Sequence, residues 1–155
     1  MTDAEIDAKL AEFDLILPHA AVPIAAYVPV FIVGRFAHVS GQLPFIGSDL
    51  LKGRLGDNVS LEEGVKAAQV CALMILAQLK AALGSLSRVD RVVKLGIFVS
   101  STDKFTGQPK VANGASELMV AVFGEAGKHA RSAVGVPVLP LGAAVEVDAI
   151  VAVHD

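Results

Sequence analysis

Two strand-like runs near the C-terminal end of the chain constrain the fold more than any other feature. They cover residues 131–138 and 144–153, and Leu139-Pro-Leu-Gly142 separates them. In the second run small and branched apolar residues occupy one face, while Glu146 and Asp148 occupy the other. Because side chains alternate with a period of two along a strand, each run predicts a half-buried strand.

A cation and a carboxylate stand out on these runs. In the first run Arg131 lies on the face opposite the valines. If the valine faces of both strands cover the core, Arg131 and Glu146 emerge together on the other face of one sheet and form a candidate binding site. In a simple hairpin, however, Glu146 would oppose Gly135, about 13 Å along the strand from Arg131. The two side chains would then meet only through ligand and water, a different strand order or a bulge.

The rest of the chain predicts two long helices and three further strands. Ser60 and Glu63 form a capping-box pattern at the start of the first long helix, and Gly84 is a natural end for it. Pro29 cannot donate to a ladder, so the strand that contains it is expected at a sheet edge. In order, the predicted elements are a short helix over 3–14, strands over 27–33 and 36–41, a loop over 41–59, a helix over 60–83, a strand over 91–100, a helix over 108–123 and the two C-terminal strands.

This order of elements predicts an α+β fold, a two-layer sandwich in which the two main helices cover one face of a mixed sheet. The 155 residues fit a single domain, with residues 1–14 as an N-terminal helix extension that turns Ile6, Leu10 and Phe13 inward. The other face of the sheet would be bare in a monomer. The 54% of hydrophobic residues fits either an apolar surface buried by other subunits or simple alanine richness, and composition does not decide between them. The bare face mixes charged with apolar residues, and this mixture leads us to expect other subunits on it.

Composition argues against several classes of function. The net charge of −3 argues against a protein that binds nucleic acid electrostatically. The single cysteine, Cys71, excludes an internal disulfide, and its place in an apolar helix predicts a buried structural thiol. The four histidines have no metal-ligand spacing, which argues against a metal site. They are His19, His38, His129 and His154.

Hydropathy and the N-terminal residues bear on location. The most apolar run, residues 70–83, is interrupted by Gln78 and Lys80 and is shorter than a membrane span. The first residues are acidic, whereas a secretory signal begins with basic residues. We therefore expect a cytoplasmic protein with no membrane partner.

Two separated motifs resemble one known family. Ala130-Arg131-Ser132, followed by a valine-rich strand and Val145-Glu146-Val147, is similar to the C-terminal signature of the RidA/YjgF family of reactive intermediate deaminases, also known as L-PSP endoribonucleases. Tyr27 and the segment Val39-Ser40-Gly41-Gln42-Leu43-Pro44 resemble that family's N-terminal elements. The order of strands and helices also matches, so the resemblance covers about residues 15–153.

The resemblance implies a chorismate-mutase-like fold that assembles as a homotrimer, with clefts between adjacent subunits. It further implies a deaminase that hydrolyses reactive 2-imino acids to 2-keto acids and ammonia, with no metal and no cofactor. Arg131 would hold the substrate carboxylate, and Glu146 would orient or activate water. A planar guanidinium can hold a carboxylate through two parallel hydrogen bonds, which makes the first role chemically reasonable.

The resemblance also implies a set of substrate-binding positions. Tyr27, Ser40 and Gly41 would line the cleft, and Asn113 stands where family members carry an asparagine in the second helix. Ala133 lies two residues after the arginine, where many members have a cysteine. A catalytic thiol is therefore excluded at that position.

Two other functions stay open. The family also carries an endoribonuclease or translation-inhibitor activity, which the acidic net charge argues against. A non-catalytic trimer that binds small carboxylates would use the same arginine, so the sequence does not separate it from an enzyme. His129 departs from the family pattern, which usually has a small residue or proline there. The length of 155 residues, with its N-terminal helix, indicates a longer branch whose substrate preference can differ.

Overall fold

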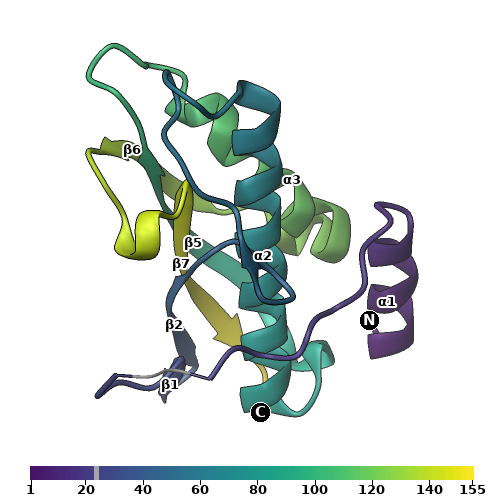
Figure 1. The fold of residues 1–155 in the computed structure, drawn as a ribbon. Helices are drawn as coiled ribbons and strands as arrows, with labels where there is room; N and C mark the ends of the chain where they lie inside the picture. The colour runs from purple at the N-terminus through teal and green to yellow at the C-terminus, as the bar shows by residue number, and fades with distance from the viewer. Residues whose placement is uncertain (23–24) are drawn as a thin grey trace.

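The computed structural model describes residues 1–22 and 25–155, and it has two layers (Figure 1). The helices are α1 (Asp3–Ala11), α2 (Leu61–Leu83) and α3 (Gln108–Phe123). The strands are β1 (Val30–Val33), β2 (Phe36–Gln42), β3 (Phe45–Ile46), β4 (Asp49–Leu50), β5 (Val89–Ser100), β6 (Ala130–Val136) and β7 (Val145–Val153). Short 3₁₀ turns cover Leu86–Arg88, Gly124–Gly127 and Pro140–Gly142.

The main sheet is mixed and has the strand order β1-β2-β7-β5-β6. β5 and β6 run parallel and are connected through α3, whereas the other neighbouring strands are antiparallel. β1 lies at an edge as predicted, but it begins at Val30, so Pro29 precedes the strand and the predicted start at residue 27 is wrong. β6 and β7 follow each other in the chain but do not pair, because β5 lies between them. β6 and β7 therefore do not form the simple hairpin considered from the sequence. The alternative of a different strand order is confirmed.

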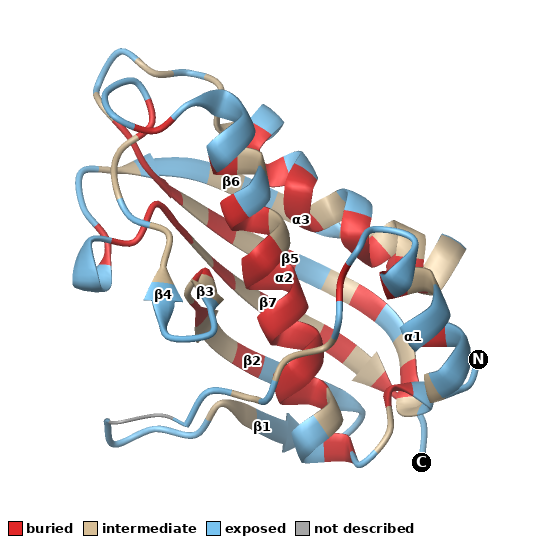
Figure 2. Ribbon diagram, turned by 45° about the vertical axis from the view of Figure 1, so that its right-hand side comes forward, coloured by how far each residue is buried: buried red, intermediate tan, exposed pale blue. Residues whose placement is uncertain are grey.

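Both long helices cover the same face of this sheet (Figure 2). α2 packs over β7 and β2, and α3 packs over β5 and β6. Along β7 the residues that face the helices are buried and alternate with half-buried ones, in keeping with the alternation in its sequence. The predicted α+β two-layer fold is confirmed. Within the segment predicted as a loop, β2 continues to Gln42, and β3 and β4 form a small separate pair.

The central helix α2 begins and ends where its sequence predicts. The Ser60 side chain accepts a hydrogen bond from the backbone N–H of Glu63, and the Glu63 carboxylate accepts one from the N–H of Ser60, both at 3.1 Å. Gly84 follows the helix with a φ of 84°, which favours glycine.

By length and composition α2 could cross a membrane, contrary to the prediction from residues 70–83 alone. Its 23 residues pass that test, but 67% of its most apolar window is buried inside the domain. The packing of α2 on the sheet and on α3 makes it the core helix of this fold.

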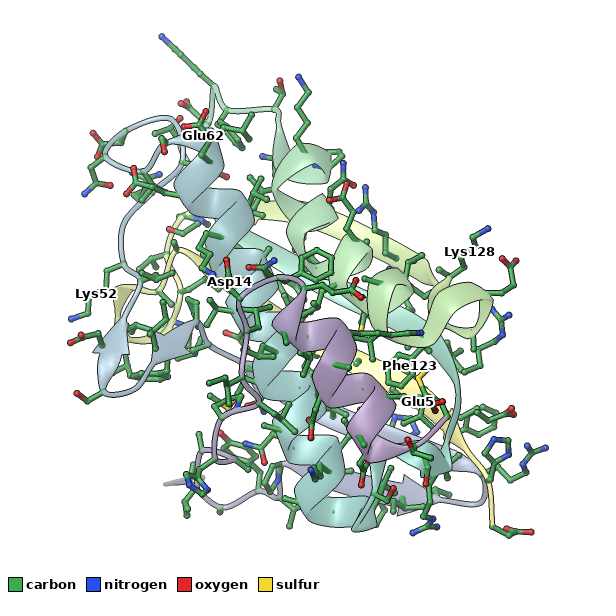
Figure 3. The ribbon with its side chains drawn as sticks, turned by 90° about the vertical axis from the view of Figure 1, so that its right-hand side faces the viewer. Glu5, Asp14, Lys52, Glu62, Phe123 and Lys128 are labelled. Atoms are coloured by element: carbon green, nitrogen blue, oxygen red, sulfur yellow. The ribbon has the colours of Figure 1, made fainter. Side chains whose placement is uncertain are left out.

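The N-terminal helix α1 is shorter than predicted. Ile6 and Leu10 are buried, but the helix ends at Ala11 and Phe13 is 41% exposed, so the predicted inward position of Phe13 is wrong. The helix has already ended at Ala11, and the turn over residues 12–14, in which Asp14 has a φ of 56°, leaves Phe13 outside the buried stripe. Figure 3 shows α1 lying over the outside of the helix layer, where Lys9 Nζ donates to the Val122 carbonyl at 3.2 Å.

The opposite face of the sheet is not covered by α1, α2 or α3, and we call it the open face. It carries large apolar side chains at the surface, of which Phe36 is 46% and Val134 is 45% exposed. It also carries the two carboxylates of β7, which are half-buried against the sheet. The residues of this face include Phe36, His38, Phe98, Val134, Glu146, Asp148 and Ile150.

Candidate active site

Arg131 is the second residue of β6 and points toward the helix layer. In the parallel ladder it pairs with Leu95, which is fully buried beneath the helices. Paired residues of neighbouring strands share a face, so Arg131 lies on the helix side of the sheet. The prediction that it emerges on the helix-free face is wrong, because Ala133 and Gly135, not the valines, face α3.

The small residues of β6 explain this inversion. A Cβ atom at Gly135 would lie 2.6 Å from Ser101 Oγ and 2.8 Å from Gln108 Nε2. Ala133, the next residue on that face after Arg131, packs against the core. Only small side chains leave room for the start of α3, so the bulky valines of this strand face outward.

Arg131 is fixed by the outer side of α3. Its Nη1 donates to Asn113 Oδ1 at 2.9 Å and to Ser116 Oγ at 3.0 Å, and its Nη2 donates to the Pro109 carbonyl at 3.2 Å. Positions 109, 113 and 116 lie on one side of a helix because they are four and three residues apart. The guanidinium is thus held at the edge of the sheet while staying partly exposed.

Glu146 lies on the other face of the sheet. It pairs with Phe98 in the antiparallel ladder between β5 and β7, with Asp148 two residues along the same face. A Cβ atom at Gly41 would overlap the Glu146 carboxylate, so glycine is what lets this carboxylate lie against β2. Burial against the sheet, and then the nearby Asp148 charge, raise the pKa of Glu146 above its ordinary value.

Ser40 and Tyr27 lie beside Gly41. The Ser40 hydroxyl donates to the Val28 carbonyl at 2.8 Å, and the Ser40 N–H donates to the Pro29 carbonyl at 2.9 Å. These bonds hold the segment that carries Tyr27 against β2. Tyr27 is 52% exposed and shares with Gly41 the lining of a cavity of about 500 Å³.

The structure therefore divides the predicted residues into two groups. The arginine half-site consists of Arg131, Asn113 and Ala133, and the glutamate half-site consists of Glu146 with Gly41 and Ser40 of β2. Tyr27 shares with Gly41 only the cavity that also borders Met74 and Gln78 of α2. β6 and β7 are two strand spacings apart, about 10 Å, with β5 between them, and the two half-sites use opposite faces of the sheet. Within one chain Arg131 and Glu146 do not share a pocket.

Comparison with known proteins decides the family. The sequence profile of the family described as "YjgF/chorismate mutase-like, putative endoribonuclease" matches residues 7–152. The chain belongs to this family. It is 49% identical to Protein TCP17 of Trypanosoma cruzi over an alignment of 158 residues that covers 100% of this chain and 98% of that protein.

Solved structures agree with membership in the YjgF family. The protein Atu1372 of Agrobacterium tumefaciens, described as having unknown function, has a TM-score of 0.94 and 45% identity, covering 98% of this chain and 94% of that one. RidA from the Antarctic bacterium Psychrobacter sp. PAMC 21119 has a TM-score of 0.61 and 29% identity, covering 86% of this chain and 94% of that one. The family identified from the Arg131 and Glu146 motifs is confirmed.

Sequence reasoning missed two polar residues of this YjgF-family site. Ser116 Oγ lies 2.9 Å from His129 Nε2, and it accepts the hydrogen bond from Arg131 described above. The spacing of Ser116, three residues after Asn113 on a predicted helix, could have placed it beside Asn113. For His129 the only signal was its position two residues before Arg131, which puts both side chains on one side of an extended chain, although β6 itself begins at Ala130.

Other groups lie outside the half-sites. A cavity of about 560 Å³ lies at the carboxyl ends of β5 and β6, lined by Arg54, Phe105, Gln108 and Gly135 among others. Cys71 is buried and its Sγ lies 3.6 Å from the Val145 carbonyl, and burial raises the pKa of its thiol. Across residues 1–22 and 25–155, no three His, Cys, Asp or Glu side chains gather where they could hold a metal ion.

Proposed function

We propose that the protein is an imine and enamine hydrolase that converts reactive 2-imino acids to 2-keto acids and ammonia, at sites formed between adjacent copies. One observation carries the proposal. On α3, Arg131 Nη1 has two acceptors and Nη2 has one, the Pro109 carbonyl at 3.2 Å, and no described residue accepts a hydrogen bond from Nε. The Nε–Nη2 edge of the guanidinium is therefore left to receive a planar carboxylate through two parallel bonds.

Glu146 suits the proton transfers of this reaction. A carboxylate whose pKa is raised by burial and by Asp148 accepts and returns protons more readily near neutral pH than an ordinary glutamate does. It would take a proton from water while the water oxygen bonds to the imine carbon, and deliver that proton to the imine nitrogen as the C=N bond opens. It would then move the hydroxyl proton of the carbinolamine to nitrogen while the C=O bond forms and the C–N bond breaks. Ammonia and the keto acid leave, and Glu146 is again a carboxylate.

Assembly supplies the missing contact between the half-sites. Arg131 stands at the edge strand β6, and Glu146 stands on the open face with Phe98 and Val134 at the same level of the sheet. A second copy that lays its β6 edge against the open face would bury those apolar side chains and bring its Arg131 toward Glu146. Such a contact joins two different surfaces, so copies related by rotation close into a ring, for which we propose a homotrimer.

The test is release of ammonia and keto acid from 2-aminoacrylate generated in situ. Arg131→Ala should abolish the increase that the protein causes in the rate of ammonia release, because the group that binds the substrate carboxylate is gone. Arg35→Ala should leave that rate unchanged. Arg35 is an exposed arginine paired with Asp90 at 3.1 Å and is therefore a matched surface control. Equal rates for wild type and Arg131→Ala would contradict the proposed function.

The family description favours a second candidate, an endoribonuclease. The net charge of −3 gives RNA no general electrostatic attraction. RNA cleavage that survives rigorous purification and disappears in Arg131→Ala would support this activity. Binding of 2-ketobutyrate together with no turnover of either substrate would instead indicate a carboxylate-binding protein. For location we propose the cytoplasm, whose reducing conditions suit a lone buried thiol.

A further inference from the structure

A chain of three hydrogen bonds lies behind Arg131. Arg131 Nη1 donates to Ser116 Oγ at 3.0 Å, Ser116 Oγ lies 2.9 Å from His129 Nε2, and His129 Nδ1 lies 2.6 Å from the Gly127 carbonyl. All three side chains are partly buried. Figure 3 labels Lys128, the residue before His129, at the outer edge of the molecule, on the opposite side of that view from Lys52.

The chemistry of each partner fixes the direction of these bonds. A carbonyl oxygen can only accept, so Nδ1 of His129 carries a hydrogen and donates it to Gly127. In the neutral ring Nε2 is then a bare acceptor, and it takes the hydroxyl hydrogen of Ser116. Because the Ser116 hydroxyl donates its hydrogen to His129, its oxygen is free to accept a hydrogen bond from the guanidinium of Arg131.

The direction of these hydrogen bonds affects the orientation of the Arg131 guanidinium. Nη1 has two acceptors, Asn113 Oδ1 and Ser116 Oγ, and together they fix the plane of the guanidinium as well as its position. Without the Ser116 oxygen, Nη1 would keep only Asn113, which is on the exposed side of α3. Asn113 and the Pro109 carbonyl, 3.2 Å from Nη2, would then be the remaining partners, and the Nε–Nη2 edge would be held less tightly.

We propose that Ser116 and His129 are positioning residues that hold Arg131 in its carboxylate-binding orientation through a relay of one fixed direction, Arg131 to Ser116 to His129 to Gly127. The inference rests on the carboxylate-binding role proposed above for Arg131. Neither residue touches the substrate. His129 fixes the direction of the Ser116 hydroxyl, and the Ser116 oxygen then fixes the guanidinium of Arg131. Without His129 the Ser116 hydroxyl could rotate, and it would hold the guanidinium less firmly.

The experiment begins with the ligand-free protein, by nuclear magnetic resonance at about pH 8, where an ordinary histidine is neutral. Nitrogen shifts of the His129 ring should show a hydrogen on Nδ1 and none on Nε2. The Nη hydrogens of Arg131 should be resolved as separate signals in the wild type. They should merge through faster rotation in Ser116→Ala and in His129→Phe, which keeps the ring but removes its nitrogens.

Binding of 2-ketobutyrate is the second readout. Loss of one hydrogen bond to a charged group predicts roughly tenfold weaker binding in Ser116→Ala and His129→Phe, with recovery in His129→Gln, which restores an acceptor. His154→Phe, at a histidine whose Nε2 lies 3.7 Å from Asp90 Oδ1, should bind like wild type. Thermal melting of each variant shows whether it is folded.

The outcomes separate the relay from the proposed function. A hydrogen on Nε2 of His129 would overturn the relay, and so would unchanged Arg131 signals and unchanged affinity in folded Ser116→Ala and His129→Phe. A wild type that binds no 2-ketobutyrate but shows the expected ring state and Arg131 signals would overturn the carboxylate-binding function. The nuclear magnetic resonance signals alone would then support the relay.

Discussion

The arginine and glutamate half-sites differ in how far their own chain completes them. The guanidinium of Arg131 has three partners on α3 and keeps one free edge. The carboxylate of Glu146 lies half-buried against Gly41, with the like charge of Asp148 nearby, and no cation within salt-bridge distance in the described residues. The arginine half-site is thus ordered and has a free edge that can bind an anion. The glutamate half-site has a carboxylate without a cation partner among the described residues, on the apolar open face.

Under the proposed function, this difference assigns different tasks to the two half-sites. A rigid, preorganised cation is suited to binding, since little freedom is lost when the ligand arrives. A carboxylate with a raised pKa is suited to moving protons. Substitutions in the two half-sites should therefore affect different kinetic constants.

The largest effect is expected from Glu146→Gln, which keeps the side-chain volume but removes the base. Loss of general acid–base catalysis predicts a fall in kcat of about 10²–10⁴-fold with KM little changed. Steady-state deaminase kinetics measure this split. A rise in KM at constant kcat would show that Glu146 binds substrate and does not move protons.

Arg131→Lys tests the other half-site. The charge stays, but the planar fork and the bonds to Asn113 and Ser116 are lost. We expect affinity for 2-ketobutyrate to fall by about tenfold to a hundredfold, measured by calorimetry. Full retention of affinity would mean that a point charge is enough and that the orientation of the guanidinium has no role.

Gly41→Ala should have a smaller effect and act through Glu146. The added methyl group would displace the Glu146 carboxylate from β2. We expect kcat to fall about tenfold and the free energy of unfolding to fall by about 1–3 kcal/mol. Denaturant titration and kinetics on the same sample measure both effects. Unchanged kcat would show that this position of the carboxylate is not the active one.

Asp148→Asn should give the smallest change, a shift of the pH profile. Asp148 raises the pKa of Glu146, so removing its charge lowers that pKa. A base works only when deprotonated, and activity is lost as the pH falls through its pKa. The acidic limb of the kcat profile should therefore move to lower pH in Asp148→Asn. An acidic limb at the same pH in Asp148→Asn and wild type would mean that a group other than Glu146 determines this loss of activity.

Local signals in the sequence predicted most of the fold. Ser60, Glu63 and Gly84 marked both ends of α2, and Pro29 marked the edge strand, because caps and missing donors act over a few residues. The face of Arg131 could not be predicted in this way. Bulk usually marks the buried side of a strand, but α3 packs closely onto β6 and admits only Ala133 and Gly135.

The candidate site was predicted only in part for a related reason. The motifs named Arg131 and Glu146, but their placement on opposite faces follows from β5 lying between β6 and β7, which is a property of the whole chain. Ser116 and His129 lie thirteen residues apart in sequence and meet because α3 crosses back over β6. No pattern within either segment contains that contact.

Mixing two inactive variants tests the central claim most directly. Arg131→Ala and Glu146→Gln chains, denatured together at equal amounts and refolded, would form some sites with an intact arginine from one chain and an intact glutamate from another. If the site forms between copies in a ring, random mixing predicts recovery of roughly a quarter of wild-type activity. If both residues act within one chain, every site carries a defect, and the mixture would stay as inactive as either variant alone.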